Sequence, residues 1–124
     1  MKRDPDLIRT ILLAVEATPA GEPISNNDIE AEGHDPVEVS EHVQLLHQAG
    51  FLEVTISQEL KPRGSRTCFI RRITWNGHEY LDTIRDPRIW ARTKDAVAKV
   101  GGATSVELIK FVATQFAKEA LGFR

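Results

Sequence analysis

The side chains in this chain that most often bind metals or attack substrates are four histidines and one cysteine. His42 and His47 are five residues apart, so on a helix they point about 140° apart and do not converge on one ion. We therefore predict no metal site, and we interpret His42, which falls on an apolar helix face, as a core histidine. Cys68 lies in a β-prone run without an adjacent histidine, which predicts a buried, inert thiol.

Acid–base and phosphate-loop chemistry are not indicated either. Glu79, Asp82 and Asp86 have helical spacings, but arginines are interspersed among them, which indicates surface ion pairs rather than a catalytic pair. Gly101 and Gly102 follow a helical segment instead of a strand, so they do not form a phosphate-binding loop. The sequence therefore predicts neither an enzyme nor a bound cofactor.

The charge distribution points to a different chemistry. Residues 1–50 hold three bases and ten acids, whereas residues 61–72 hold five bases and no acid, although the whole chain has a net charge of −2. A cationic segment of this kind attracts phosphate, and Lys61, Arg63 and Arg66 are the residues we expect to contact a nucleic-acid backbone. The alternative is a solvated hairpin tip, where charged residues are also common.

A helix expected between Asp35 and Gly50 precedes this segment. Asp35 can cap it, Pro36 suits its first position, and Gly50 can end it. One face is apolar and predicts core packing. The opposite face has no Lys or Arg, but it carries short or amide side chains that fit base edges in the major groove: Ser40, Gln44, His47 and Gln48. A solvated surface is the equally weighted alternative, because Glu38 and Glu41 would repel phosphate.

The remaining pattern places this helix within a winged architecture. After Gly50 the alternation of apolar residues predicts a strand over 52–57, and a second β-prone run over 67–74 completes a hairpin. Further helices are expected at 4–17, 74–85, 86–100 and 104–121, and Ile24 and the Ser25 cap predict a short strand and a short helix. The fold class is thus mainly α with a small β-hairpin, a winged helix-turn-helix with extra C-terminal helices.

This organisation suggests a winged helix-turn-helix domain over residues 1–85 and a helical extension over 86–124. The last helix is apolar around more of its circumference than one core contact needs, which predicts a homodimer through the C-terminal helices.

Trp75 and Trp90 are interpreted as core or interface anchors rather than as platforms for stacked bases. The absence of a long apolar run excludes a membrane span, and the single cysteine and the polar start predict a cytoplasmic location.

Two resemblances add to these predictions. Thr74, Gly77 and Leu81 reproduce the Thr-x-x-Gly-x-x-x-Leu step that follows the wing in many bacterial winged helix-turn-helix regulators. Most of the chain also resembles an uncharacterised bacterial and prophage-associated protein family, a domain of unknown function, which implies a winged helix-turn-helix fold and little about chemistry. The residues that carry this resemblance are Met1–Asp4, Asp6–Arg9, Leu45, Leu46, Ala49, Gly50, Thr74, Trp75, Gly77–Glu79, Leu81, Asp82, Ile84–Asp86, Trp90, Lys94, Gly101 and Gly102.

The leading hypothesis from the sequence is a winged-helix protein that binds double-stranded DNA and regulates transcription of phage or bacterial genes. Its predicted DNA-binding residues lie on the helix and on the hairpin: Ser40, Gln44, His47, Gln48, Lys61, Arg63 and Arg66. The alternative hypothesis is a winged-helix module for protein–protein interaction without DNA binding, for which the acidic first half and the apolar last helix are the reasons.

Overall fold

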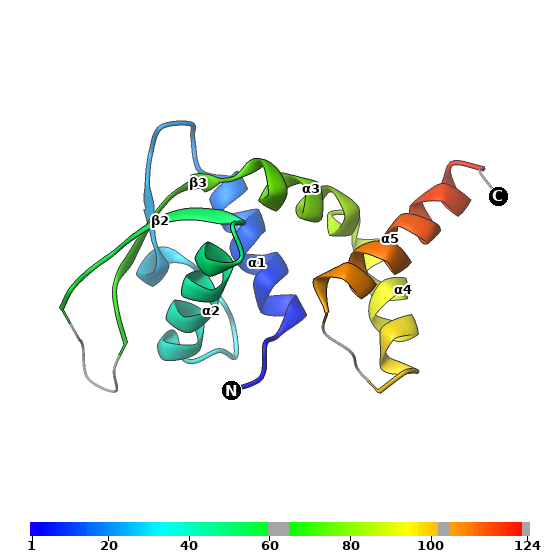
Figure 1. Ribbon diagram of the computed structural model, residues 1–124, viewed down its shortest axis with the longest axis horizontal. Helices are drawn as coiled ribbons and strands as arrows, with labels where there is room; N and C mark the ends of the chain where they lie inside the picture. Colours follow the sequence, from blue (N-terminus) through cyan, green and yellow to red (C-terminus); the bar gives the residue numbers. More distant parts are fainter. Residues whose placement is uncertain (60–64, 102–104, 123–124) are drawn as a thin grey trace. The chain divides into compact units, whose positions relative to one another are not determined.

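The computed structural model of the protein describes residues 1–59, 65–101 and 105–122 (Figure 1). The chain forms two compact units, Met1–His78 and Glu79–Arg124, and each is considered by itself. The division into a domain of residues 1–85 and an extension of 86–124 stays a prediction. Within the described ranges, no helix combines the length and the apolar character needed to cross a membrane.

Helix α1 (Pro5–Glu16) opens the first unit, as its capping signal predicts. The Asp4 carboxylate accepts hydrogen bonds from the backbone N–H groups of Asp6 (2.9 Å) and Leu7 (3.3 Å), which satisfies donors that the first helical turn leaves unpaired. The apolar stripe of α1 is buried along its whole length: Leu7, Ile8, Ile11, Leu12 and Val15. This helix therefore supplies much of the core of the first unit.

A three-stranded antiparallel sheet packs against α1 and contains β1 (Ile24–Ser25), β2 (Leu52–Ile56) and β3 (Cys68–Ile73) in the order β1-β3-β2. The short strand expected at Ile24 is confirmed, since Ile24 pairs with Ile70. The pairing of β2 with β3 shifts by one residue, because Glu53 faces Arg72 whereas Val54 faces Ile70. Arg71 is thus an extra residue in a β-bulge, and both Arg71 and Arg72 are exposed.

The second helix of the expected helix-turn-helix pair is reduced to a 3-10 turn, η1 (Asn26–Asp28). Ser25 caps it as predicted, because its Oγ accepts from Asn27 N–H at 3.1 Å. The turn ends at Ile29, whose backbone is extended. The element order α1, β1, η1, α2, β2, β3 is consistent with a winged helix whose second helix is a single turn.

Helix α2 (Pro36–Gln48) lies beside α1 and against β2 and β3 (Figure 1). The Asp35 carboxylate caps it by accepting from Val37 N–H at 2.8 Å. After the helix, Gly50 adopts a positive φ of 81°, a conformation that glycine adopts without strain, and the chain turns directly into β2. The predicted cap, core face and stop of this helix are confirmed.

Helix α3 (Trp75–Ile84) begins after β3, where the Thr74 hydroxyl accepts from Gly77 N–H at 3.1 Å and donates to the carbonyl of Gly50. Thr74 therefore acts as the predicted cap. Trp75 was interpreted as a core or interface anchor; it is 79% exposed, so the core interpretation is wrong and a role at an interface stays a prediction. It stands at the first turn of the helix, on the side away from the buried positions of α3.

The second unit contains two further helices, α4 (Pro87–Ala98) and α5 (Val106–Ala120), which pack on each other. Trp90 is buried, as expected for a core anchor. The Arg92 guanidinium lies 4.1 Å from the centre of the Phe116 ring and 3.2 Å from the Glu119 carboxylate, which joins the two helices by a cation–π contact and an ion pair. The mainly helical fold with a small antiparallel sheet is thereby confirmed.

Candidate nucleic-acid interface

The face of α2 that was expected to be exposed is partly used for internal packing. Ser40 is fully buried, and its Oγ donates a 2.6 Å hydrogen bond to the carbonyl of Arg66, at the start of the strand that returns from the hairpin tip. The prediction that Ser40 is exposed to read bases is therefore wrong. This hydroxyl instead holds the hairpin against the middle of α2.

Asn26, which was not predicted from the sequence, completes the same contact from η1. It is 4% exposed; its Oδ1 accepts from Cys68 N–H at 2.8 Å and its Nδ2 donates to the carbonyl of Arg66 at 3.5 Å. We call Asn26, Ser40 and the Arg66–Cys68 backbone the hairpin clamp. It joins η1, α2 and β3, so it fixes the orientation of the hairpin relative to α2. A polar residue just after a short strand was the one signal in the sequence.

The other three predicted residues of α2 are more accessible. Gln44 is half-buried and its Nε2 donates to the Oγ (3.2 Å) and the carbonyl (3.4 Å) of Ser40. His47 is exposed, and its Nδ1–H donates to the carbonyl of Leu52 at 3.0 Å, where β2 begins. Gln48 is exposed as well. The end of α2 therefore exposes the amide of Gln48 and the imidazole edge of His47, and the amide of Gln44 in part.

Contacts at Ser40 and His47 show how the helix runs relative to the hairpin. Ser40 contacts the strand that returns from the hairpin tip, whereas His47, two turns later, contacts the start of β2. Helix α2 thus runs beside the described part of the hairpin, from Arg66 just before β3 to Leu52 at the start of β2.

The basic residues of the hairpin have different environments. Lys61 and Arg63 lie outside the described residues. The guanidinium of Arg66 donates from Nη1 to the carbonyls of Ser57 (3.1 Å) and Gln58 (3.4 Å), which ties the two strands together below the tip. Arg66 is thus engaged in a structural contact and is only half-exposed.

Two acidic side chains near the start of α2 contact His34. The Glu38 carboxylate lies 3.0 Å from Nδ1 of His34, and Nε2 of the same ring lies 3.6 Å from the Asp4 carboxylate.

Burial raises the pKa of the Cys68 thiol, and the nearby Glu41 carboxylate raises it further. Cys68 is a buried thiol, as predicted, and is held away from the thiolate form that nucleophilic chemistry requires.

His42 has the structural role expected of it. It is 1% exposed; Asp4 N–H donates to its Nε2 at 2.9 Å, and its Nδ1–H donates to the carbonyl of Glu38 at 2.8 Å. These two bonds link the start of α1 to α2. Within the described parts of the chain, no three His, Cys, Asp or Glu side chains are grouped so as to hold a metal ion.

Comparisons with known proteins place the chain in a family. A model of a family described as hypothetical proteins, DUF2513, matches residues 2–104. An uncharacterised protein of Haemophilus influenzae is 34% identical over 121 residues, which cover 98% of this chain and 99% of that protein. No solved structure matches. The chain therefore belongs to the DUF2513 family of hypothetical proteins.

Proposed function

We propose that this protein binds double-stranded DNA through the outer side of α2 and the tip of the hairpin, and that it acts as a transcriptional regulator of phage or bacterial genes. The observation that carries the proposal is the hairpin clamp, in which Ser40 bonds to the Arg66 carbonyl at 2.6 Å. A hairpin fixed beside a helix is what lets both elements contact one duplex.

The contacting residues in this proposal are a subset of those predicted from the sequence. Gln44, His47 and Gln48 face base edges, and Lys61 and Arg63 face phosphates. Ser40 and Arg66 are positioning residues, because the first holds the hairpin to α2 and the second ties its strands together. Because α2 contains Glu38 and Glu41 and no Lys or Arg, the proposal assigns most of the phosphate attraction to the hairpin tip.

A salt-dependent titration tests this assignment. Fluorescence anisotropy with a labelled duplex would measure log K against log salt for the protein and for a Lys61→Gln, Arg63→Gln variant. Each lost phosphate contact removes about 0.9 from the slope, so the variant is expected to be flatter by about 1.8. An Arg88→Gln, Lys99→Gln variant removes the same charge from α4 and its C-cap, and its slope should be unchanged. Equal slopes in all three proteins would refute the role of the hairpin tip.

Exposed aromatic residues favour one alternative, a winged-helix module that binds a protein and not DNA. Trp75 is 79% exposed and Phe69, on β3, is 47% exposed, and such side chains are enriched at the centres of protein interfaces. The alternative would be supported if duplex DNA gave no anisotropy change and a defined protein partner bound the wild type but not a Trp75→Ala variant. DNA binding that is unaffected by Trp75→Ala would oppose it.

We also propose that the protein forms a homodimer through α5. Phe111 is 62% exposed and Leu121 is 75% exposed, whereas Ile109 and Ala113 on the same helix are buried against its neighbours. An apolar surface of this kind is stabilised when a second copy covers it. Sedimentation velocity should detect a dimer that a Phe111→Ser variant weakens and that a Gln115→Ser variant, on the same helix, leaves intact. A monomer at all concentrations would contradict the proposal.

A further inference from the structure

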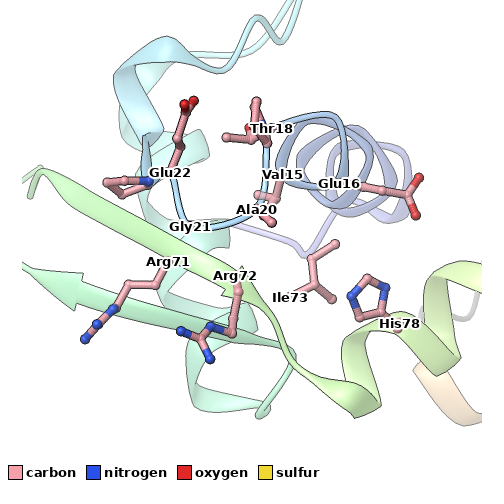
Figure 2. A pocket seen from close by; sticks show the side chains of 12 residues that line it. Val15, Glu16, Thr18, Ala20, Gly21, Glu22, Arg71, Arg72, Ile73 and His78 are labelled. Atoms are coloured by element: carbon pink, nitrogen blue, oxygen red, sulfur yellow. The ribbon is translucent and has the colours of Figure 1, made fainter.

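The first unit contains a cavity that the proposed DNA-binding surface does not use. It has a volume of about 680 Å³ and lies where the loop after α1, residues 17–23, passes over β3 (Figure 2). Val15 and Ile73 form apolar parts of its wall, and Arg71, Arg72 and His78 supply polar groups. A volume of this size is within the range of small-molecule sites in proteins.

The loop that covers the cavity is held by its own hydrogen bonds. The Thr18 hydroxyl donates to the carbonyl of Ala14 at 3.1 Å, and Glu22 N–H donates to the carbonyl of Pro19 at 3.1 Å. Two prolines further limit its backbone, and Gly21 supplies the positive φ of 84° that its turn needs. The cavity is therefore formed before any ligand binds.

The β-bulge places two arginines at this site. In a regular strand, Arg71 and Arg72 would point to opposite faces of the sheet, but the extra residue lets both be exposed on the same strand (Figure 2). Arg72 is paired, since its Nε lies 2.9 Å from the Glu53 carboxylate. The Arg71 guanidinium has no hydrogen bond or ion pair with any other residue that the structure describes. An unpaired guanidinium beside a cavity is suited to bind an anion bidentately.

Two carboxylates also line the cavity, and their orientation limits their effect. Figure 2 shows the Glu22 side chain directed away from β3 and the Glu16 side chain directed away from the loop, whereas the side chains of Arg71 and Arg72 extend from β3 on the side opposite the loop. The rim of the cavity on the outer side of β3 is thus cationic, and its wall on the loop side, with Val15 and Ile73, is apolar. That combination selects a ligand with a charged end and an apolar body.

We propose that this cavity binds a small organic anion, an aryl phosphate or aryl carboxylate, whose charged group is held by Arg71 and whose ring contacts Val15 and Ile73. His78, at the first turns of α3, lies at the rim and contributes a donor to the anion. Because none of the residues that line this cavity belongs to α2, this site is separate from the proposed DNA-binding surface. The proposal of an anion site in this cavity does not depend on whether the protein binds DNA.

Isothermal titration calorimetry with phenyl phosphate tests the proposal. We expect millimolar or tighter binding to the wild type and at least a roughly tenfold weaker Kd for Arg71→Gln, since a hydrogen bond to a charged group is lost. Arg88→Gln, a change of the same charge on a 92%-exposed side chain of α4, should leave the Kd unchanged. Equal affinity of all three proteins, or no binding to the wild type, would overturn the site.

Two further arms separate the parts of the proposal. An Ala20→Phe variant fills the cavity without changing its charge, so it should abolish binding while its melting temperature matches that of the wild type. Inorganic phosphate should bind more weakly than phenyl phosphate; equal binding would overturn the role of the apolar wall. If Arg71→Gln weakened binding to duplex DNA and phenyl phosphate did not bind, the arginine would serve the DNA backbone and the proposal would fail.

Discussion

Replacing Asn26 by alanine tests the hairpin clamp through stability. Asn26 is 4% exposed, and its Oδ1 accepts from Cys68 N–H at 2.8 Å, so the change leaves a buried N–H donor without a partner. The Arg66 carbonyl loses only the longer bond, because Ser40 still donates to it at 2.6 Å. An unsatisfied buried donor costs about 1–3 kcal/mol. For a domain of this size, this corresponds to a fall of about 4–12 °C in melting temperature.

Urea denaturation followed by far-UV circular dichroism would measure the free energy of unfolding of the wild type and of Asn26→Ala. The matched control is Asn27→Ala, the same substitution one residue later, at an exposed side chain. The control should lie within about 0.5 kcal/mol of the wild type. If both variants were equally stable, the polar contacts between η1 and β3 would not hold the hairpin, and the reasoning from the clamp to the interface would be refuted.

Three further predictions concern packing, thiol reactivity and pH. A Gly77→Ala change should lower the melting temperature, because its Cβ would lie 2.3 Å from the carbonyl oxygen of Phe51, and overpacking of this kind costs about 1–3 kcal/mol; a thermal melt checks it. Cys68 should react with a thiol-specific reagent only after unfolding, since burial raises its pKa and removes it from solvent, and a kinetic assay with and without denaturant compares the two states. Hydrogen bonds from backbone N–H groups, that of Ile89 first, lower the pKa of Asp86 below its ordinary value of 3.8. The contribution of Asp86 to the stability of the fold is therefore complete above pH 3.8 and is lost as the pH falls through the lowered pKa. An Asp86→Ala variant should be less stable than the wild type at pH 7, and the difference in free energy of unfolding should shrink in acid.

The helix starts were predictable because they depend on residues next to each other in sequence. Asp4, Asp35 and Asp86 each precede a proline and each accepts from backbone N–H groups of the following turn, as local capping rules indicate. The alternation that predicts β2 and the core face of α2 has the same local origin. These features depend on the backbone geometry of one segment and need no knowledge of distant contacts.

The clamp was not predictable because it depends on residues far apart in the chain. A helical projection of α2 separates an apolar arc from a polar arc, and it places Ser40 on the polar one. Burial of Ser40 requires the backbone of Arg66, 26 residues later, to pass against that side of the helix. The same limit applies to Asn26, whose partner Cys68 is 42 residues away. A short polar side chain at a packed position looks identical, in sequence, to one that faces solvent.

Trp75 shows the opposite error. A tryptophan with apolar neighbours in a predicted helix favours burial, but Trp75 occupies the first position of α3, where the chain has just left β3 and no described element covers it. The exposure of both Arg71 and Arg72 at the bulge could not be predicted from the sequence either. The run Arg71–Arg72 is visible in the sequence, whereas the register shift that exposes both side chains depends on the pairing with β2.

The central claim, that α2 and the hairpin contact one duplex together, is tested most directly by nuclear magnetic resonance. Adding a short DNA duplex to ¹⁵N-labelled protein should shift amide signals of two segments at the same duplex concentration, the end of α2 around Gln44–Gln48 and the hairpin around Ser57–Arg66. Signals of α4 and α5 should stay in place. Shifts confined to one of the two segments, or centred on Trp75 instead, would contradict the account.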